Sequence, residues 1–162
     1  ALSLGTPFFH VYQFITYMFL HVNFEHIFFN MFALWMFGRT LEYELGQKRF
    51  LTYYMVCGIG AALIQYLTAL AFGEFPLVLV GASGAVMGLL LAFGVLHPNA
   101  VIMLLIPPIP MKAKWFVVIY GVIELFLGWR GVGNVAHFAH VGGMLWGFLL
   151  LQWWKQRGII RF

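Results

Sequence analysis

Charged side chains are scarce in this chain. Only 9% of its 162 residues are Asp, Glu, Lys or Arg, whereas 63% are hydrophobic. Soluble domains carry about 25% charged residues. So few charges cannot cover a water-facing surface, and we expect one polytopic membrane domain over residues 1–162, with lipid as its outer solvent. The nine basic residues are dispersed along the chain, which argues against a nucleic-acid partner.

Aspartate is absent altogether, and serine and cysteine are rare. The sequence holds five Glu, two Ser and one Cys, which is Cys57. A single cysteine excludes an internal disulfide framework. Without Asp, the chain can form neither a pair of catalytic aspartates nor a Ser-His-Asp triad.

Metal-ligand motifs are also missing. His21, His26, His137 and His140 are the candidate ligands, but the sequence has no His-Glu-x-x-His motif and no supporting pattern of carboxylates. We therefore do not expect a metal ion.

Five apolar segments divide the chain. A membrane-spanning helix takes about 20 residues, so the second is long enough, the fifth is nearly so and the third is short. At about 1.5 Å per residue the third covers only ~21 Å, which predicts a helix that starts part-way through the bilayer after a re-entrant loop. Gly81 and Gly84 suit that tight entry. The segments are 27–38, 50–72, 83–96, 115–128 and 137–154.

Basic residues predict the orientation of these segments. If successive loops alternate between the two sides, every Lys and Arg except Arg130 lies on one side, which the positive-inside rule makes cytoplasmic. We therefore expect a multi-pass protein of the cell (inner) membrane with a cytoplasmic C-terminus. Five spans place Ala1 on the outer side, which predicts one further helix before it in the parent protein.

Ser83 stands at the start of the third segment, in the run Val-Gly-Ala-Ser-Gly-Ala of residues 80–85. A serine nucleophile needs an adjacent base and hydrogen-bond donors for the developing oxyanion. The first turn of a helix supplies free backbone N–H groups and the positive end of the helix dipole. Ser83 is therefore a candidate nucleophile; the alternative is an ordinary N-cap serine beside glycines that pack helices.

His140 is the candidate base, because a histidine within a transmembrane segment is costly and marks a functional site by default. Stripes of small residues near both candidates would let the two helix backbones approach closely. His137 is the rival base, but bulkier residues follow it at the offsets where glycines follow His140. The stripes are Gly84 and Gly88 after Ser83, and Ala139, Gly143 and Gly147 around His140.

Three more polar residues lie in or beside apolar segments. His26 and Asn30 are one helical turn apart, and both side chains can donate to an oxyanion; the alternative role is hydrogen bonding between helices. Glu124 lies inside the fourth segment, where an unpaired carboxylate is expensive. We expect it to be paired, with Arg130 as the candidate partner, rather than protonated or beside a wet cavity.

Together these motifs resemble the rhomboid family of intramembrane serine proteases, in the same order and from about Pro7 to Trp154. Residues 26–30 are similar to the family's His-xxx-Asn segment, residues 81–84 to its Gly-x-Ser-Gly motif, and residues 139–143 to its Ala-His-x-Gly-Gly motif. The resemblance implies a six-helix bundle in which Ser83 is the nucleophile and His140 the general base, acting as a dyad.

The resemblance has further implications for the site. His26, Asn30 and the backbone N–H of Ser83 would bind the oxyanion, the substrates would be single-span proteins of the lipid bilayer, and no cofactor would be needed. Two positions depart from the family pattern: Tyr12-Gln13 stand where many members have Trp-Arg, and Met87 stands where many have an aromatic residue four positions after the serine.

Two other functions are compatible with a chain of this kind. One is a non-catalytic rhomboid-like protein that binds membrane clients, which loss of the serine or histidine would mark. The other is a small transporter or channel, which would need a polar path, and only Glu124 is a candidate for that. The sequence therefore favours an intramembrane serine endopeptidase.

Overall fold

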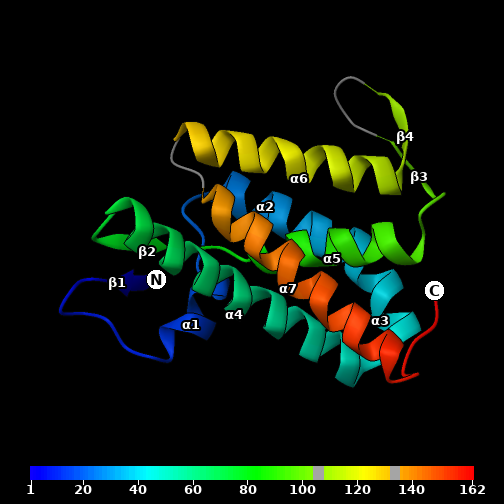
Figure 1. Ribbon diagram of the computed structural model, residues 1–162, viewed down its shortest axis with the longest axis horizontal. Helices are drawn as coiled ribbons and strands as arrows, with labels where there is room; N and C mark the ends of the chain where they lie inside the picture. The colour runs from blue at the N-terminus through cyan, green and yellow to red at the C-terminus, as the bar shows by residue number, and fades with distance from the viewer. Residues whose placement is uncertain (104–107, 132–135) are drawn as a thin grey trace.

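The computed structural model describes residues 1–103, 108–131 and 136–162 and confirms a mainly helical protein (Figure 1). The helices are α1 (Gln13–Thr16), a 3-10 turn (Tyr17–Phe19), α2 (Phe24–Ala33), a π-type turn (Leu34–Gly38), α3 (Arg39–Leu45), α4 (Gln47–Phe72), α5 (Ser83–Leu96), α6 (Ala113–Arg130) and α7 (His137–Gln156). The strands are β1 (Leu2–Leu4), β2 (Leu77–Leu79), β3 (Val101–Met103) and β4 (Pro110–Lys112).

Each predicted apolar segment lies within helical structure. The third segment coincides with α5, and the first continues from α2 through the π-type turn into α3 without a break. Within the described residues, α4 alone is both long and apolar enough to cross a membrane, while α5 is apolar but shorter. The number of five spans therefore stays a prediction.

Helices α4, α5 and α7 pack against one another and form the centre of the molecule. Helix α7 lies between α4 and α6 (Figure 1). Small residues line the central contacts, so that Ala61, Ala85 and Cys57 are completely buried. Because glycine and alanine let helix backbones approach closely, this composition brings the start of α5 next to the start of α7.

The outward faces of α6 and α7 are apolar. On α6, Val122 and Phe126 are largely exposed, and on α7 Leu145 and Leu149 are nearly half exposed. A surface helix of a soluble protein carries polar side chains on such a face. These faces are suited to contact with lipid.

Two short antiparallel strand pairs, which the sequence did not predict, hold the connecting segments. β1 pairs with β2, so the first residues of the chain lie beside the segment that leads into Ser83. Gln13 supports this arrangement, because its Oε1 accepts from the N–H of Ser3 at 3.1 Å and its Nε2 donates to the carbonyl of Phe8 at 2.9 Å. β3 and β4 form the second pair, between α5 and α6.

Candidate active site

Ser83 is the first residue of α5, and its side chain does not cap the helix. Ala82 occupies the N-cap position, where no side-chain cap exists. The chain enters the helix through Gly81, whose φ of +112° disfavours any residue with a side chain. A Cβ at Gly81 would also lie 2.6 Å from Cε1 of His26. The N-cap alternative for Ser83 is therefore wrong, and its hydroxyl is available for other contacts.

The hydroxyl of Ser83 contacts the imidazole of His140. Oγ of Ser83 lies 2.8 Å from Nε2 of His140, and His140 is 8% exposed. His137, the rival base, is also buried, but its Nδ1 contacts a carboxylate of α6 instead. The structure thus places the hydroxyl and the imidazole at hydrogen-bond distance, although 57 residues separate them along the chain.

This contact depends on the close approach of α5 and α7. A Cβ at Gly143 would collide with the carbonyl oxygen of Gly84, and a Cβ at Gly88 would lie 3.1 Å from the carbonyl oxygen of Gly143. Gln65 of α4 holds the start of α7, because its Oε1 accepts from the N–H of Ala139 at 3.0 Å. The side chain of Gln65 therefore holds the backbone of the residue that precedes His140.

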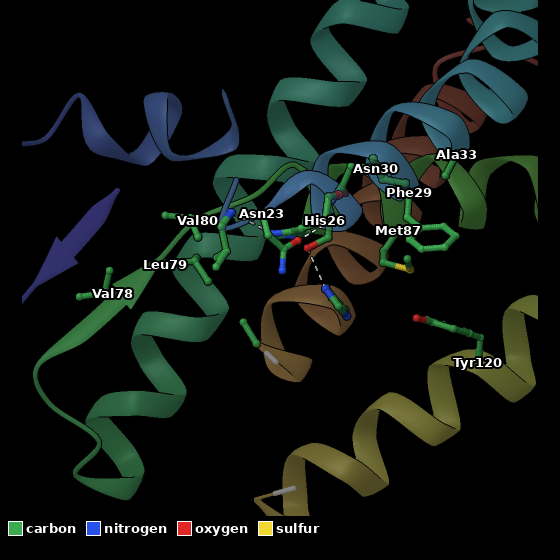
Figure 2. Close-up of a pocket in the computed structure, with 15 residues that line it drawn as sticks. Asn23, His26, Phe29, Asn30, Ala33, Val78, Leu79, Val80, Met87 and Tyr120 are labelled. Atoms are coloured by element: carbon green, nitrogen blue, oxygen red, sulfur yellow. Dashed lines mark hydrogen bonds between the residues drawn. The ribbon is translucent and has the colours of Figure 1, made fainter. Parts of the chain in front are cut away.

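Ser83 and His140 open onto a cavity of about 560 Å³, which Figure 2 shows with its lining side chains. A volume of this size is typical of ligand-binding sites. The walls come from α2, β2 and the residue after it, α5, α6 and the start of α7. The lining residues are Val22, Asn23, His26, Phe29, Asn30, Ala33, Val78, Leu79, Val80, Ser83, Val86, Met87, Tyr120, Ala136 and His140.

Helix α2 brings the two predicted oxyanion donors to the same cavity (Figure 2). Nδ1 of His26 accepts from the N–H of Val22 at 3.5 Å, so a neutral ring carries its proton on Nε2. Asn30 is 6% exposed, and its Nδ2 donates to the carbonyl of His26 at 2.8 Å. An amide has two N–H donors, and this bond uses one of them.

His21 adjoins His26 at the edge of the site. The two ring centroids are 5.0 Å apart. Burial lowers the pKa of His21, and the nearby His26 lowers it further. His21 is therefore uncharged near neutral pH, and it places no positive charge beside the cavity.

Glu124 contacts two histidines of α7, one of which is His140, and the sequence analysis did not predict these partners. The expected pairing with Arg130 is wrong: the carboxylate of Glu124 faces α7, where Oε2 lies 2.7 Å from Nδ1 of His137 and 3.1 Å from Nδ1 of His140. Glu124 is 5% exposed. Its position six residues before the end of α6 gave no sign of this partner, because the crossing of α6 over α7 decides which residues meet.

These three residues are also the group that could hold a metal ion, among the residues that the structure describes. The ligand atoms of Glu124, His137 and His140 all lie within 4.8 Å of one another. A carboxylate and two imidazoles suit a transition metal. In the arrangement observed, Nδ1 of His137 contacts the carboxylate of Glu124 at 2.7 Å, and Nδ1 of His140 lies at ion-pair distance from the same oxygen.

Comparison with known proteins identifies the family of this chain. The family model of the rhomboid domain matches residues 9–155. The chain belongs to the rhomboid family. Members of this family are helical membrane proteins, which agrees with the composition and the apolar outer faces. The rhomboid motifs contribute Ser83, His140, His26 and Asn30 to one cavity.

Two relatives show the extent of the similarity within the rhomboid family. Rhomboid protein 1, mitochondrial, of Saccharomyces cerevisiae is 34% identical over 146 residues, which cover 87% of this chain and 41% of the relative. Presenilin-associated rhomboid-like protein A, mitochondrial, of Danio rerio is 32% identical over 154 residues, which cover 89% of this chain and 39% of the relative. The chain thus spans about two fifths of the length of these rhomboid relatives.

Proposed function

We propose that this chain is an intramembrane serine endopeptidase that cleaves single-span membrane proteins. The observation that carries the proposal is the 2.8 Å contact between Oγ of Ser83 and Nε2 of His140 inside a cavity. Membership of the rhomboid family supports it, since the family generally contains intramembrane serine proteases.

The proposed reaction is acyl transfer through Ser83. Oγ of Ser83 attacks the carbonyl carbon of the scissile peptide bond while Nε2 of His140 takes the hydroxyl proton. His140 then gives this proton to the leaving amine as the C–N bond breaks. Water attacks the resulting ester with His140 again as base, which releases the acid product and restores the Ser83 hydroxyl.

Three donors are proposed to bind the oxyanion of the tetrahedral intermediate. They are Nε2 of His26, the second N–H of Asn30 and the backbone N–H of Ser83. The last belongs to the first turn of α5, where backbone N–H groups lack helical partners. Donors fixed before the reaction stabilise the developing charge without reorganisation.

The proposed membrane arrangement has five spans, with the basic tail on the cytoplasmic side of the cell (inner) membrane. The C-terminus and the start of α6 lie at the same end of the molecule, and the end of α6 lies at the other (Figure 1). Most basic residues therefore gather at one end, as the positive-inside rule requires. A substrate helix would enter from the lipid and unwind in the cavity.

A non-catalytic, client-binding rhomboid is the alternative. Such a protein has no need of a serine hydroxyl at hydrogen-bond distance from a buried imidazole. The short Ser83–His140 contact therefore favours the endopeptidase.

Covalent labelling tests the proposal. A fluorophosphonate probe added to the detergent-solubilised protein should phosphonylate Ser83, and mass spectrometry of the peptide around residues 80–85 identifies the site. The control is Ser3, the second serine of the chain, which should stay unmodified.

A cleavage assay completes the test. A single-span reporter reconstituted with the protein in liposomes should be cut, and the Ser83→Ala variant should leave it intact. An unlabelled Ser83 together with an intact reporter would refute the proposed function.

A further inference from the structure

Glu124 is the one buried carboxylate among the residues that the structure describes, and the proposed dyad leaves it without a role. The other four Glu are exposed, whereas Glu124 is 5% exposed and lies between two histidines. We propose that Glu124 is a positioning residue for His140, so that Ser83, His140 and Glu124 work as a triad. This inference rests on the proposed serine endopeptidase.

The contacts of His140 carry the proposal. Its Nε2 lies 2.8 Å from Oγ of Ser83, and its Nδ1, on the other side of the ring, lies 3.1 Å from Oε2 of Glu124. The three groups thus follow one another in the order hydroxyl, imidazole, carboxylate. This is the order in which a nucleophile, a base and the group that orients the base are placed in serine hydrolases.

Proton positions explain why His140 needs this carboxylate. Nε2 can accept the Ser83 proton only when the neutral ring carries its own proton on Nδ1. A buried Nδ1–H without an acceptor is costly, so a ring with no carboxylate there would favour the opposite, inactive tautomer. Once Nε2 has taken the Ser83 proton, the ring is positive in a low-dielectric site, and the negative carboxylate stabilises it.

His137 holds the carboxylate in place. Its Nδ1 lies 2.7 Å from the same Oε2 atom of Glu124, and both histidines are on the first turn of α7. Nδ1 of His140 makes no hydrogen bond of regular geometry within the described residues, although the carboxylate is at ion-pair distance. Catalytic hydrogen bonds are often long or misaligned without substrate and shorten in the reacting complex.

The competing explanation is that Glu124 is a purely structural partner of His137. Under that explanation, removal of either residue costs stability and affects catalysis only through misfolding. A positioning role instead makes Glu124 more important than His137 for turnover, and makes the carboxylate itself necessary.

Four variants of the full chain separate these explanations in reconstituted liposomes. Glu124→Gln keeps the shape and removes the charge, and we expect kcat to fall about 10³-fold while KM changes less than about 3-fold. Glu124→Asp retains a carboxylate, and its kcat should be at least about 10-fold higher than that of Glu124→Gln. His137→Gln should lower kcat by less than about 10-fold.

Glu44→Gln is the matched control, because Glu44 also pairs with a histidine, His97, at 2.9 Å and lies outside the cavity. Its kcat should equal that of the unchanged protein. Thermal melts in detergent accompany each kcat and show which variants are folded. If Glu124→Gln fails to fold, folded Glu124→Asp is compared with folded His137→Gln. A positioning role predicts that the shortened carboxylate lowers kcat more than loss of the His137 imidazole does, whereas a purely structural role predicts that neither folded variant loses kcat.

Three results would overturn the inference. One is wild-type kcat in folded Glu124→Gln; another is equal losses in Glu124→Gln and His137→Gln. A third is loss of wild-type activity with a chelator such as 1,10-phenanthroline, which would make the three residues a metal site. Fluorophosphonate labelling of Ser83 in the unchanged protein tells these failures apart from failure of the proposed function, because the label needs a reactive serine and no substrate.

Discussion

Ser83 has two hydrogen-bonding options at the start of α5, and a shift of one residue selects between them. At the N-cap position its hydroxyl would accept from a backbone N–H of the first turn. As the first helical residue, it instead contacts Nε2 of His140. The positive φ of Gly81 turns the chain one residue before Ala82 and so sets this register.

Variants of Ser83 and His140 should show that the two residues act as a unit. Ser83→Ala and His140→Ala are each expected to lower kcat by several orders of magnitude, and the double variant should be no worse. The measurement is cleavage of a single-span reporter in liposomes. Additive losses, or an active His140→Ala protein beside an inactive His137→Ala protein, would contradict the assignment of the base.

Asn30→Ala should have a smaller effect that is confined to the chemical step. One oxyanion donor is worth about 3 kcal/mol when it is well aligned, but His26 and the Ser83 amide remain, so we expect a fall in kcat of about 10²-fold or less. KM should change little. The check is a full Michaelis–Menten curve for both proteins; a change in KM alone would place Asn30 outside the oxyanion site.

Helices α5 and α7 meet through backbone atoms, and this contact sets the distance between Ser83 and His140, the proposed catalytic pair. The carbonyl of Gly84 faces Gly143, and the carbonyl of Gly143 faces Gly88. Neither contact can yield by rotation of a side chain. A methyl group between the two helices must therefore move one helix as a body, together with Ser83 or His140.

Gly143→Ala should abolish the proposed cleavage activity although it alters no reacting group. The added methyl collides with the carbonyl of Gly84, and a displacement of about 1 Å can cost about 10²-fold in rate. Within a helix, replacing Gly by Ala normally stabilises by roughly 0.5–1 kcal/mol, so a lower melting temperature would come from the collision.

Gly121→Ala on α6 is the matched control for Gly143→Ala. A Cβ there would lie 3.3 Å from Cε of Met144, the end of a flexible side chain that can move aside. Its cleavage rate should stay within about 3-fold of the rate of the unchanged protein. Normal cleavage by Gly143→Ala would show that the backbone contact does not fix the catalytic spacing.

At the scale of the whole molecule, the sequence predicted the helices better than their contacts. The bounds of α5 follow from Gly81 before it and from the apolar run of 83–96, which are local signals. The partner of Glu124 depends on how α6 crosses α7, and no local pattern encodes that crossing. β1 and β2 were missed for a similar reason: three-residue strands have little intrinsic preference, and their pairing arises from tertiary contact.

The orientation of the molecule in the membrane gives a further prediction. Lys114→Cys and Arg161→Cys should react with a membrane-impermeant maleimide from one side of sealed vesicles, and Arg130→Cys from the other. All three positions are exposed. The native Cys57 is completely buried and should not react with the maleimide. Labelling of all three positions from the same side would show that α6 does not cross the membrane.

The backbone contact between α5 and α7 also restricts how this protein can be engineered. Every substitution at Gly84, Gly88 or Gly143 adds side-chain volume between the two helices. Random mutagenesis at these positions can therefore only push α5 and α7 apart. A library for altered cleavage preference should keep them fixed and vary cavity-wall residues such as Val78 and Met87, where both larger and smaller side chains are accessible. Selection would then sample changes in substrate fit while the distance between hydroxyl and imidazole is preserved.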